Sequence, residues 1–243
     1  MNPIWVITKK ELGSFFDSLI AYVILIAFLG LSGLFTWDPF ELIGSSDIFF
    51  RKQADLQAFF GIAYWTLFFF VPALTMRQIA EERKTGTIEL LLTKDVTDRQ
   101  LIIGKFLACF LMVCIALAFT LPYYFTVAKL GDIDHGATLC GYLGLLLMSA
   151  AYISIGLFSS SVTSNQIVAF LLAILIGVLF HILFEVMAGN GQGWFSNLLE
   201  NMSLRYHFDS IQRGVIDTKD LVYFASIIVL GLGLSELIIS KRS

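Results

Sequence analysis

Residues 77–105 read RQIAEERKTGTIELLLTKDVTDRQLIIGK and separate two apolar runs, Ala58–Met76 and Phe106–Ala128, that contain no charged residue. The segment holds six of the chain's 16 lysines and arginines, although charged residues make up only 14% of the sequence. Two long apolar runs joined by a charged segment are typical of two membrane-spanning helices and an intervening loop in water. The segment therefore sets the fold class, and it is the part of the chain best suited to contact a water-soluble partner.

Six runs are long enough to cross a bilayer, whose hydrocarbon core needs about 20 apolar residues per helix. They are residues 18–37, 58–76, 106–128, 137–160, 164–184 and 221–240. The first five contain no Asp, Glu, Lys or Arg, and the sixth contains only Glu236. With 57% hydrophobic residues and a mean hydropathy of +0.80, the chain differs strongly from a soluble domain. Because backbone groups in lipid must bond to each other, we expect an all-α membrane protein with six transmembrane helices, as one transmembrane domain over residues 1–243.

The distribution of basic residues predicts the orientation of these helices. If the N-terminus is cytoplasmic, the inner segments (residues 1–17, 77–105, 161–163 and 241–243) contain ten Lys and Arg. The outer segments, including the long loop at residues 189–220, contain the other six. Basic residues accumulate on the cytoplasmic side. We therefore expect both termini to be cytoplasmic.

Two non-spanning regions are predicted to contain short helices. Before the first span, a helical projection separates apolar from polar residues: Trp5, Leu12, Phe16 and Leu19 against Lys10, Ser14 and Asp17. This pattern favours an amphipathic helix in the membrane interface, with an ordinary juxtamembrane tail as the alternative. Trp194 and Phe195, in the segment between the fifth and sixth spans, indicate short helices at the outer interface.

The residue types associated with catalysis or metal binding form no recognisable site. Cys109, Cys114 and Cys140 all lie in predicted spans and lack metal-ligand spacing. Gly104-Lys105 resembles the end of a phosphate loop, but the glycine and Ser/Thr positions of that motif are occupied by Arg99 and Phe106. We expect no catalytic residue, metal or cofactor in this chain, and any ATP must be hydrolysed on another polypeptide.

Within residues 77–105, polarity changes along the chain. Residues 81–84 are charged, whereas Ile88 and residues 90–92 are apolar but too few to span a membrane. Apolar side chains of this kind need a protein groove or the membrane surface to cover them. The alternative is a solvated loop.

Three stretches of the sequence together resemble the membrane subunit of type-2 ABC transporters, and they extend over nearly the whole chain. They are residues 72–77 (PALTMR) with 80–93 (AEERKTGTIELLLT) and 104–105 (GK); residues 208–209 (FD), 213–217 (RGVID), Asp220 and Tyr223; and residues 8–12 (TKKEL), 15–18 (FFDS) and 21–22 (AY). Within that family the chain is most similar to the gliding-motility (GldF-type) permeases and to the permeases of nitrous-oxide-reductase maturation.

The resemblance implies a dimer of membrane subunits, homo- or heterodimeric, with two ABC ATP-binding subunits docked beneath it. It implies an exporter in a bacterial inner membrane, driven by ATP and Mg²⁺ bound to the partner. A coupling helix between spans two and three would enter a cleft on the ATPase. Its expected coupling residues are Glu81, Glu82, Arg83, Gly86 and Glu89. No nucleic-acid partner is expected.

His181 and Glu185 are four residues apart near the outer end of the fifth span and are candidates for an outer gate. Glu185 lying simply among lipid headgroups is the alternative. Two other function classes are also considered. A secondary transporter should show repeats and charged or broken helices at the bilayer midplane, which this sequence lacks. A membrane anchor that recruits an ATPase without moving a substrate would use the same loop.

Overall fold

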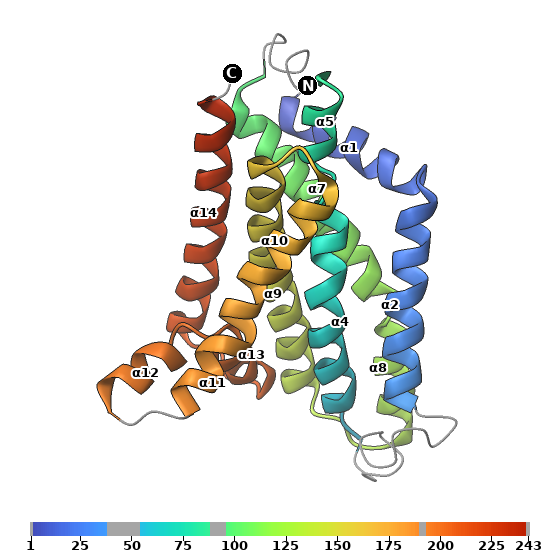
Figure 1. The fold of residues 1–243 in the computed structure, drawn as a ribbon. Coiled ribbons are helices and arrows are strands. Elements are labelled where there is room, and N and C mark those ends of the chain that lie inside the picture. Colours follow the sequence, from blue (N-terminus) through green and yellow to red (C-terminus); the bar gives the residue numbers. More distant parts are fainter. Residues whose placement is uncertain (1, 38–53, 88–95, 190–192, 242–243) are drawn as a thin grey trace.

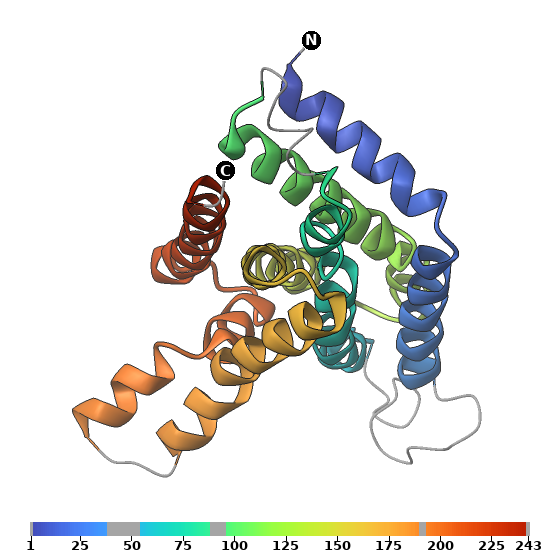
Figure 2. The same cartoon turned by 45° about the horizontal axis from the view of Figure 1, so that its top comes forward.

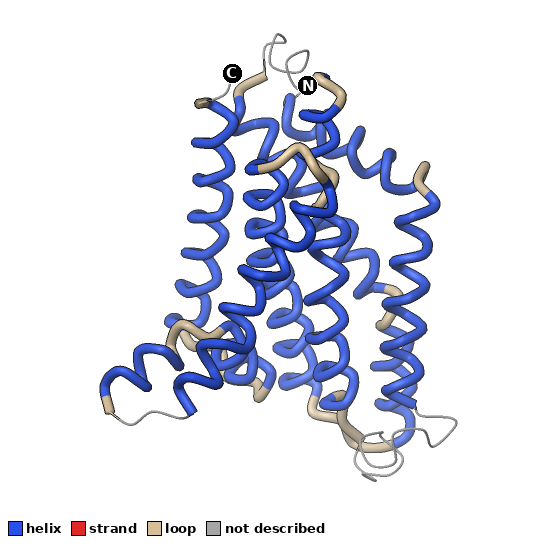
Figure 3. The backbone as a smooth tube through the Cα atoms, in the orientation of Figure 1, coloured by secondary structure: helices blue, strands red, loops and turns tan. Residues whose placement is uncertain are grey.

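The computed structural model describes residues 2–37, 54–87, 96–189 and 193–241 (Figure 1). All regular secondary structure in these residues is helical, as the tube in Figure 3 shows. Five helical segments are long and apolar enough to cross a membrane, and there are six if the bent pair formed by α1 and α2 counts as one. The prediction of an all-helical membrane protein is therefore confirmed for the described part of the chain.

The long segments follow the apolar runs of the sequence. They are α2 (Leu19–Trp37), α4 (Gln57–Thr75), α7 (Asp98–Ala118) with α8 (Leu121–Leu130), α9 (His135–Val162), α10 (Gln166–Val178) with a π-helical turn η1 (Leu179–Leu183) and α11 (Phe184–Gly189), and α14 (Thr218–Ser240). The short helices are α1 (Pro3–Phe16), α5 (Ala80–Lys84), α12 (Trp194–Glu200) and α13 (Leu204–Gln212).

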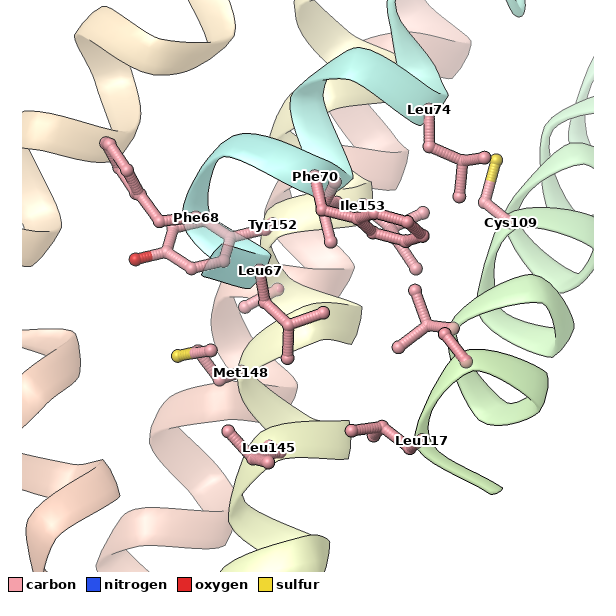
Figure 4. Close-up of a cluster of buried hydrophobic side chains, with 14 of the residues drawn as sticks. Leu67, Phe68, Phe70, Leu74, Cys109, Leu117, Leu145, Met148, Tyr152 and Ile153 are labelled. Carbon is pink, nitrogen blue, oxygen red and sulfur yellow. The ribbon is translucent and has the colours of Figure 1, made fainter. Parts of the chain in front are cut away.

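Helix α9 is the centre of the bundle and packs against α4, α7, α10, α13 and α14 (Figure 2). Its small residues allow this close packing, as is common between membrane helices. A Cβ atom at Gly141 would lie 2.4 Å from the Phe60 ring, and one at Gly156 would lie 2.0 Å from Thr75 Oγ1. The resulting core joins α4, α7 and α9 through side chains such as Leu67, Cys109 and Ile153 (Figure 4).

The two ends of the bundle carry different short helices. In Figure 1, α1 and α5 lie at the end where both chain termini are found. The turn between α9 and α10 is at this same end, whereas α11, α12 and α13 lie at the opposite end. We call the first the α5 end and the second the α13 end.

Helix α7 begins at Asp98, well before the apolar run that starts at Phe106. A capping box explains the early start: Thr97 Oγ1 accepts the Gln100 N–H, and the Gln100 side chain accepts the Thr97 N–H. The last part of the predicted polar loop is therefore helix. α7 ends at Ala118, and α8 follows with Pro122 in its first turn.

Candidate functional site

The short helix α5 is attached to the end of α9 by one buried serine. Ser160 Oγ donates a hydrogen bond to the Met76 carbonyl oxygen (3.0 Å). Ser160 Oγ also accepts the backbone N–H groups of Ile79 (3.1 Å) and Ala80 (3.0 Å). Backbone groups at a helix break have lost their helical partners and need others. Ser160 supplies them, so α5 begins at a fixed place on α9.

Lys105 on α7 is the centre of the α5 end. Its side chain is fully buried, and its Nζ lies 2.7 Å from the Gln78 carbonyl oxygen and 2.8 Å from Glu82 Oε1. Glu11 Oε1 on α1 is 3.4 Å away. A buried ammonium group is costly unless it is paired and its donors are satisfied. The three oxygens match its three donors, so Lys105 joins α1, α5 and α7.

Helix α1 lies directly on the first turns of α7. Thr8 Oγ1 donates to the Gly104 carbonyl oxygen (3.1 Å) as well as to the Ile4 carbonyl oxygen (2.8 Å). A Cβ atom at position 104 would lie 2.7 Å from Ile7 Cγ2, so the close approach depends on Gly104. The side of α1 that faces the protein carries Thr8 and Phe15, whereas Trp5 remains exposed.

A polar cleft of about 420 Å³ lies between α1 and α5. Twelve residues line it: Lys10, Glu11, Ser14, Phe15, Asp17, Ser18, Arg77, Gln78, Glu81, Glu82, Thr85 and Thr87. Arg77 Nη1 donates to Ser18 Oγ (3.1 Å), and its guanidinium carbon lies 5.8 Å from the centre of the Phe15 ring. We call this cavity the α1–α5 cleft.

The five predicted coupling residues occupy different environments. Glu81 is exposed, whereas Glu82 turns inward to Lys105 and Arg83 is half-buried. Gly86 has a φ of +69°, in the left-handed region that glycine adopts without strain, just after α5 ends. Glu89 and the apolar patch formed by Ile88 and residues 90–92 lie outside the described residues.

The two residues of the predicted outer gate have different partners in the structure. His181 is buried, hydrogen-bonds through Nδ1 to the Tyr152 hydroxyl, and stacks on Tyr64 with 4.1 Å between ring centroids. Glu185 instead forms an ion pair with Arg205, with 3.3 Å between Oε1 and Nη1.

At the α13 end, Arg205 also lies 3.7 Å from Asp209 Oδ2. Burial is the main reason why the pKa of the Asp209 carboxyl is raised above its ordinary value, and nearby Arg205 acts in the opposite direction. His207 connects three segments, because its Nδ1 lies 2.7 Å from Asp220 Oδ1 and its Nε2 lies 2.9 Å from the Asn201 carbonyl oxygen. These contacts fix α13 to α14 and to the end of α12.

The sequence did not identify Ser160 and Lys105 as members of the site. In the sequence, Lys105 stands out only as part of a failed phosphate loop and of the family resemblance, although a lone lysine among apolar residues signals burial with an acidic partner. Ser160 is the middle one of three consecutive serines. Its role depends on which of the three serines faces the link between α4 and α5, and the sequence alone does not show which one does.

Comparison with known proteins assigns the family. A family model described as ABC-2 family transporter protein matches residues 45–204, which is more than half of the chain. The match includes α5, α7 and α9, which carry Glu82, Lys105 and Ser160, and the link between α4 and α5, which carries Gln78. No curated protein matches the chain. With its long apolar helices, the chain therefore belongs to the ABC-2 transporter family and is a multi-pass membrane permease subunit of an ABC transporter.

Proposed function

We propose that this permease is driven by a separate ABC ATP-binding subunit that docks on α5, and that it exports its substrate. The carrying observation is the attachment of α5 to the bundle. Ser160 ties it to α9 and Lys105 ties it to α7 and α1, while Glu81 stays exposed. A helix that is bonded to the bundle on one side and exposed to solvent on the other is suited to transmit a movement of a docked partner to the bundle.

In this mechanism ATP and Mg²⁺ bind to the partner and not to this chain. Closure of two ATP-binding subunits would displace α5, and the displacement would reach α9 through Ser160 and α7 through Lys105. When packed helices shift as rigid bodies, such a local movement can switch the spans from one arrangement to another. A second permease subunit, identical or different, would complete the pathway, and the lipid bilayer would cover the remaining apolar faces.

We place the α5 end on the cytoplasmic side of a bacterial inner membrane. Ten of the 16 Lys and Arg lie in the segments on the side of both termini, and this bias supports that orientation. Exposed Trp5 and Phe16 on α1 support a position of this helix in the cytoplasmic interface, where aromatic residues anchor. The GldF-like sequence features make a part in gliding motility our working hypothesis for physiology, with nitrous-oxide-reductase maturation as the other.

Charge reversal on the exposed face of α5 tests docking. The permease would be co-expressed with its ABC ATP-binding subunit, and the complex purified in detergent. We expect Glu81→Lys to abolish co-purification and Glu200→Lys, an exposed charge at the α13 end, to leave it unchanged. Glu82→Lys is a poor test because it would place two ammonium groups together at Lys105. Unchanged co-purification of the Glu81→Lys variant would contradict docking on α5.

A non-transporting scaffold is the second candidate, because it would use the same docking helix. Reconstitution in proteoliposomes separates the two. A transporter should show ATPase activity that rises with a transported substrate, whereas a scaffold should show a constant basal rate. A secondary transporter should move substrate along an ion gradient without ATP.

A further inference from the structure

Gln78 and Glu82, which line the α1–α5 cleft, each carry a buried acceptor atom that no donor from the described part of the chain reaches. Gln78 is 5% exposed, and its Oε1 makes no hydrogen bond to any described residue. Glu82 Oε2 is likewise buried and without a hydrogen bond in the described part of the chain, because Lys105 binds only the other oxygen, Oε1. Buried polar atoms are nearly always satisfied, so two in one cleft need an explanation.

The donors already present are engaged elsewhere. Lys105 contacts three oxygens, and Arg77 is held by Ser18 and the Phe15 ring. Lys10 is exposed and lies 3.6 Å from Glu11. The cleft therefore presents more acceptors than donors to an incoming group.

Carboxylates reinforce this preference. Glu11, Asp17, Glu81 and Glu82 line the cleft, against two basic residues, Lys10 and Arg77. Four acidic side chains and two basic ones give a net negative lining, which favours a cation over an anion or an apolar group. The volume of about 420 Å³ is large enough for a side chain but small for a folded segment.

We propose that the α1–α5 cleft receives a basic side chain of the docked ATP-binding subunit, which donates hydrogen bonds to Gln78 Oε1 and Glu82 Oε2. Arginine fits best, because its planar group carries five donors and reaches far from its backbone. This inference rests on the proposed function and adds a second point of contact: the partner binds between α1 and α5 and not only on the outer face of α5. The N-terminal helix then belongs to the ATPase interface.

Charged thiol reagents test the cleft directly. Ser14→Cys would be introduced in a full-length variant in which Cys109, Cys114 and Cys140 are replaced by serine or alanine. Ser14 is exposed and lines the cleft, and exposed Ser164 in the turn between α9 and α10 provides a control at the same end. For each variant we would measure the rate of modification by a cationic reagent, trimethylammonium-ethyl methanethiosulfonate, and by its anionic counterpart, the sulfonatoethyl reagent. We expect the ratio of the cationic to the anionic rate to be about tenfold higher for the Ser14→Cys variant than for the Ser164→Cys variant.

Partner binding should then close the cleft. Addition of the ATP-binding subunit should slow modification of the Ser14→Cys variant at least tenfold and leave the Ser164→Cys variant unchanged. Gln78→Leu should weaken association about tenfold, which corresponds to about 1.4 kcal/mol, whereas Gln78→Glu should retain it because a carboxylate also accepts from a cation. Thermal unfolding of the permease alone, unchanged in both Gln78 variants, would show that α5 is intact.

The outcomes separate the two proposals. If the partner binds and Glu81→Lys abolishes binding while the Ser14→Cys variant is modified as fast as before, docking on α5 stands and the cleft proposal is wrong. If the Ser14→Cys variant is protected from both thiol reagents in the permease alone, the chain covers its own cleft. That result would also overturn the cleft proposal. If no ATP-binding subunit associates, both proposals fail.

Discussion

The ion pairs of Lys105 and of Arg205, at opposite ends of the bundle, differ in their exposure to water. At the α5 end, Lys105 is fully buried and its partners Glu11 and Glu82 are only 12% and 15% exposed in their side chains. At the α13 end, Arg205 and Glu185 pair at a similar distance, but both side chains are 44% exposed. The first arrangement joins α1, α5 and α7, and the second joins α13 to α11.

This difference predicts different mechanical behaviour. A buried ion pair is strongly destabilised when one partner is lost, so its members must move together. An exposed pair contributes little and is screened by water and salt, so its members can separate at low cost. We infer that α1, α5 and α7 move as one unit at the α5 end. At the α13 end, α11 can separate from α13 at low cost, while the buried contact of His207 with Asp220 keeps α13 attached to α14.

Removing Lys105 should have the largest effect. Lys105→Met leaves Glu11, Glu82 and the Gln78 carbonyl oxygen without their cation, and we expect a loss of about 3–5 kcal/mol in the free energy of unfolding. Denaturant-induced unfolding in detergent would measure it. The triple variant Lys105→Met, Glu11→Gln and Glu82→Gln removes the charges together and should recover a substantial part of the loss. A single variant as stable as the native permease would show that the buried pairs do not join the helices.

Loss of the Ser160 hydroxyl should have the next largest effect. Ser160→Ala leaves two buried N–H groups and one carbonyl oxygen unpaired, which should cost about 2 kcal/mol and loosen α5. Hydrogen exchange of residues 79–84 should become faster. Ser159→Ala is the matched control, because Ser159 Oγ bonds only to Ile155 in its own helix. Equal exchange in the two variants would contradict the role of Ser160.

Overpacking the contact between α1 and α7 should have a smaller effect. Gly104→Ala places a Cβ atom 2.7 Å from Ile7 Cγ2 and 3.2 Å from the Ile4 carbonyl oxygen, so α1 must move, at a cost of about 1–2 kcal/mol. Gly13→Ala is the control, because nothing lies within 4 Å of that Cβ position and alanine favours helix by about 0.5–1 kcal/mol. Thermal unfolding should move in opposite directions for these two variants. A shift in the same direction would show that α1 does not rest on Gly104.

The long helices could be predicted because membrane spans depend on local composition alone. Runs of 20 apolar residues have few alternatives in lipid, and each predicted run is occupied by a helix. The start of α7 could not be placed from apolarity, because the capping box at Thr97 and the partners of Lys105 extend the helix into a polar segment.

The candidate site was less predictable, because it depends on contacts between distant residues. Glu81 and Glu82 are adjacent and chemically identical, yet one is exposed and the other meets Lys105 across the end of the bundle. His181 and Glu185 have helical spacing, yet one bonds to Tyr152 and the other to Arg205. No periodicity in the sequence marks either effect, since both depend on partners from other helices.

Neutralising Arg205 should have the smallest effect and gives the sharpest check on the comparison. Arg205→Gln removes ion pairs with Glu185 and Asp209 that are about half-exposed, so we expect a loss of less than about 1 kcal/mol. Raising the ionic strength from about 0.05 M to 1 M should reduce even this difference, because the Debye length falls to about 3 Å. The Lys105→Met loss should persist at high salt, because its partners are shielded from ions. If Arg205→Gln were as harmful as Lys105→Met, α11 would be joined to α13 as firmly as α5 is joined to α7, and the inferred difference between the two ends would be wrong.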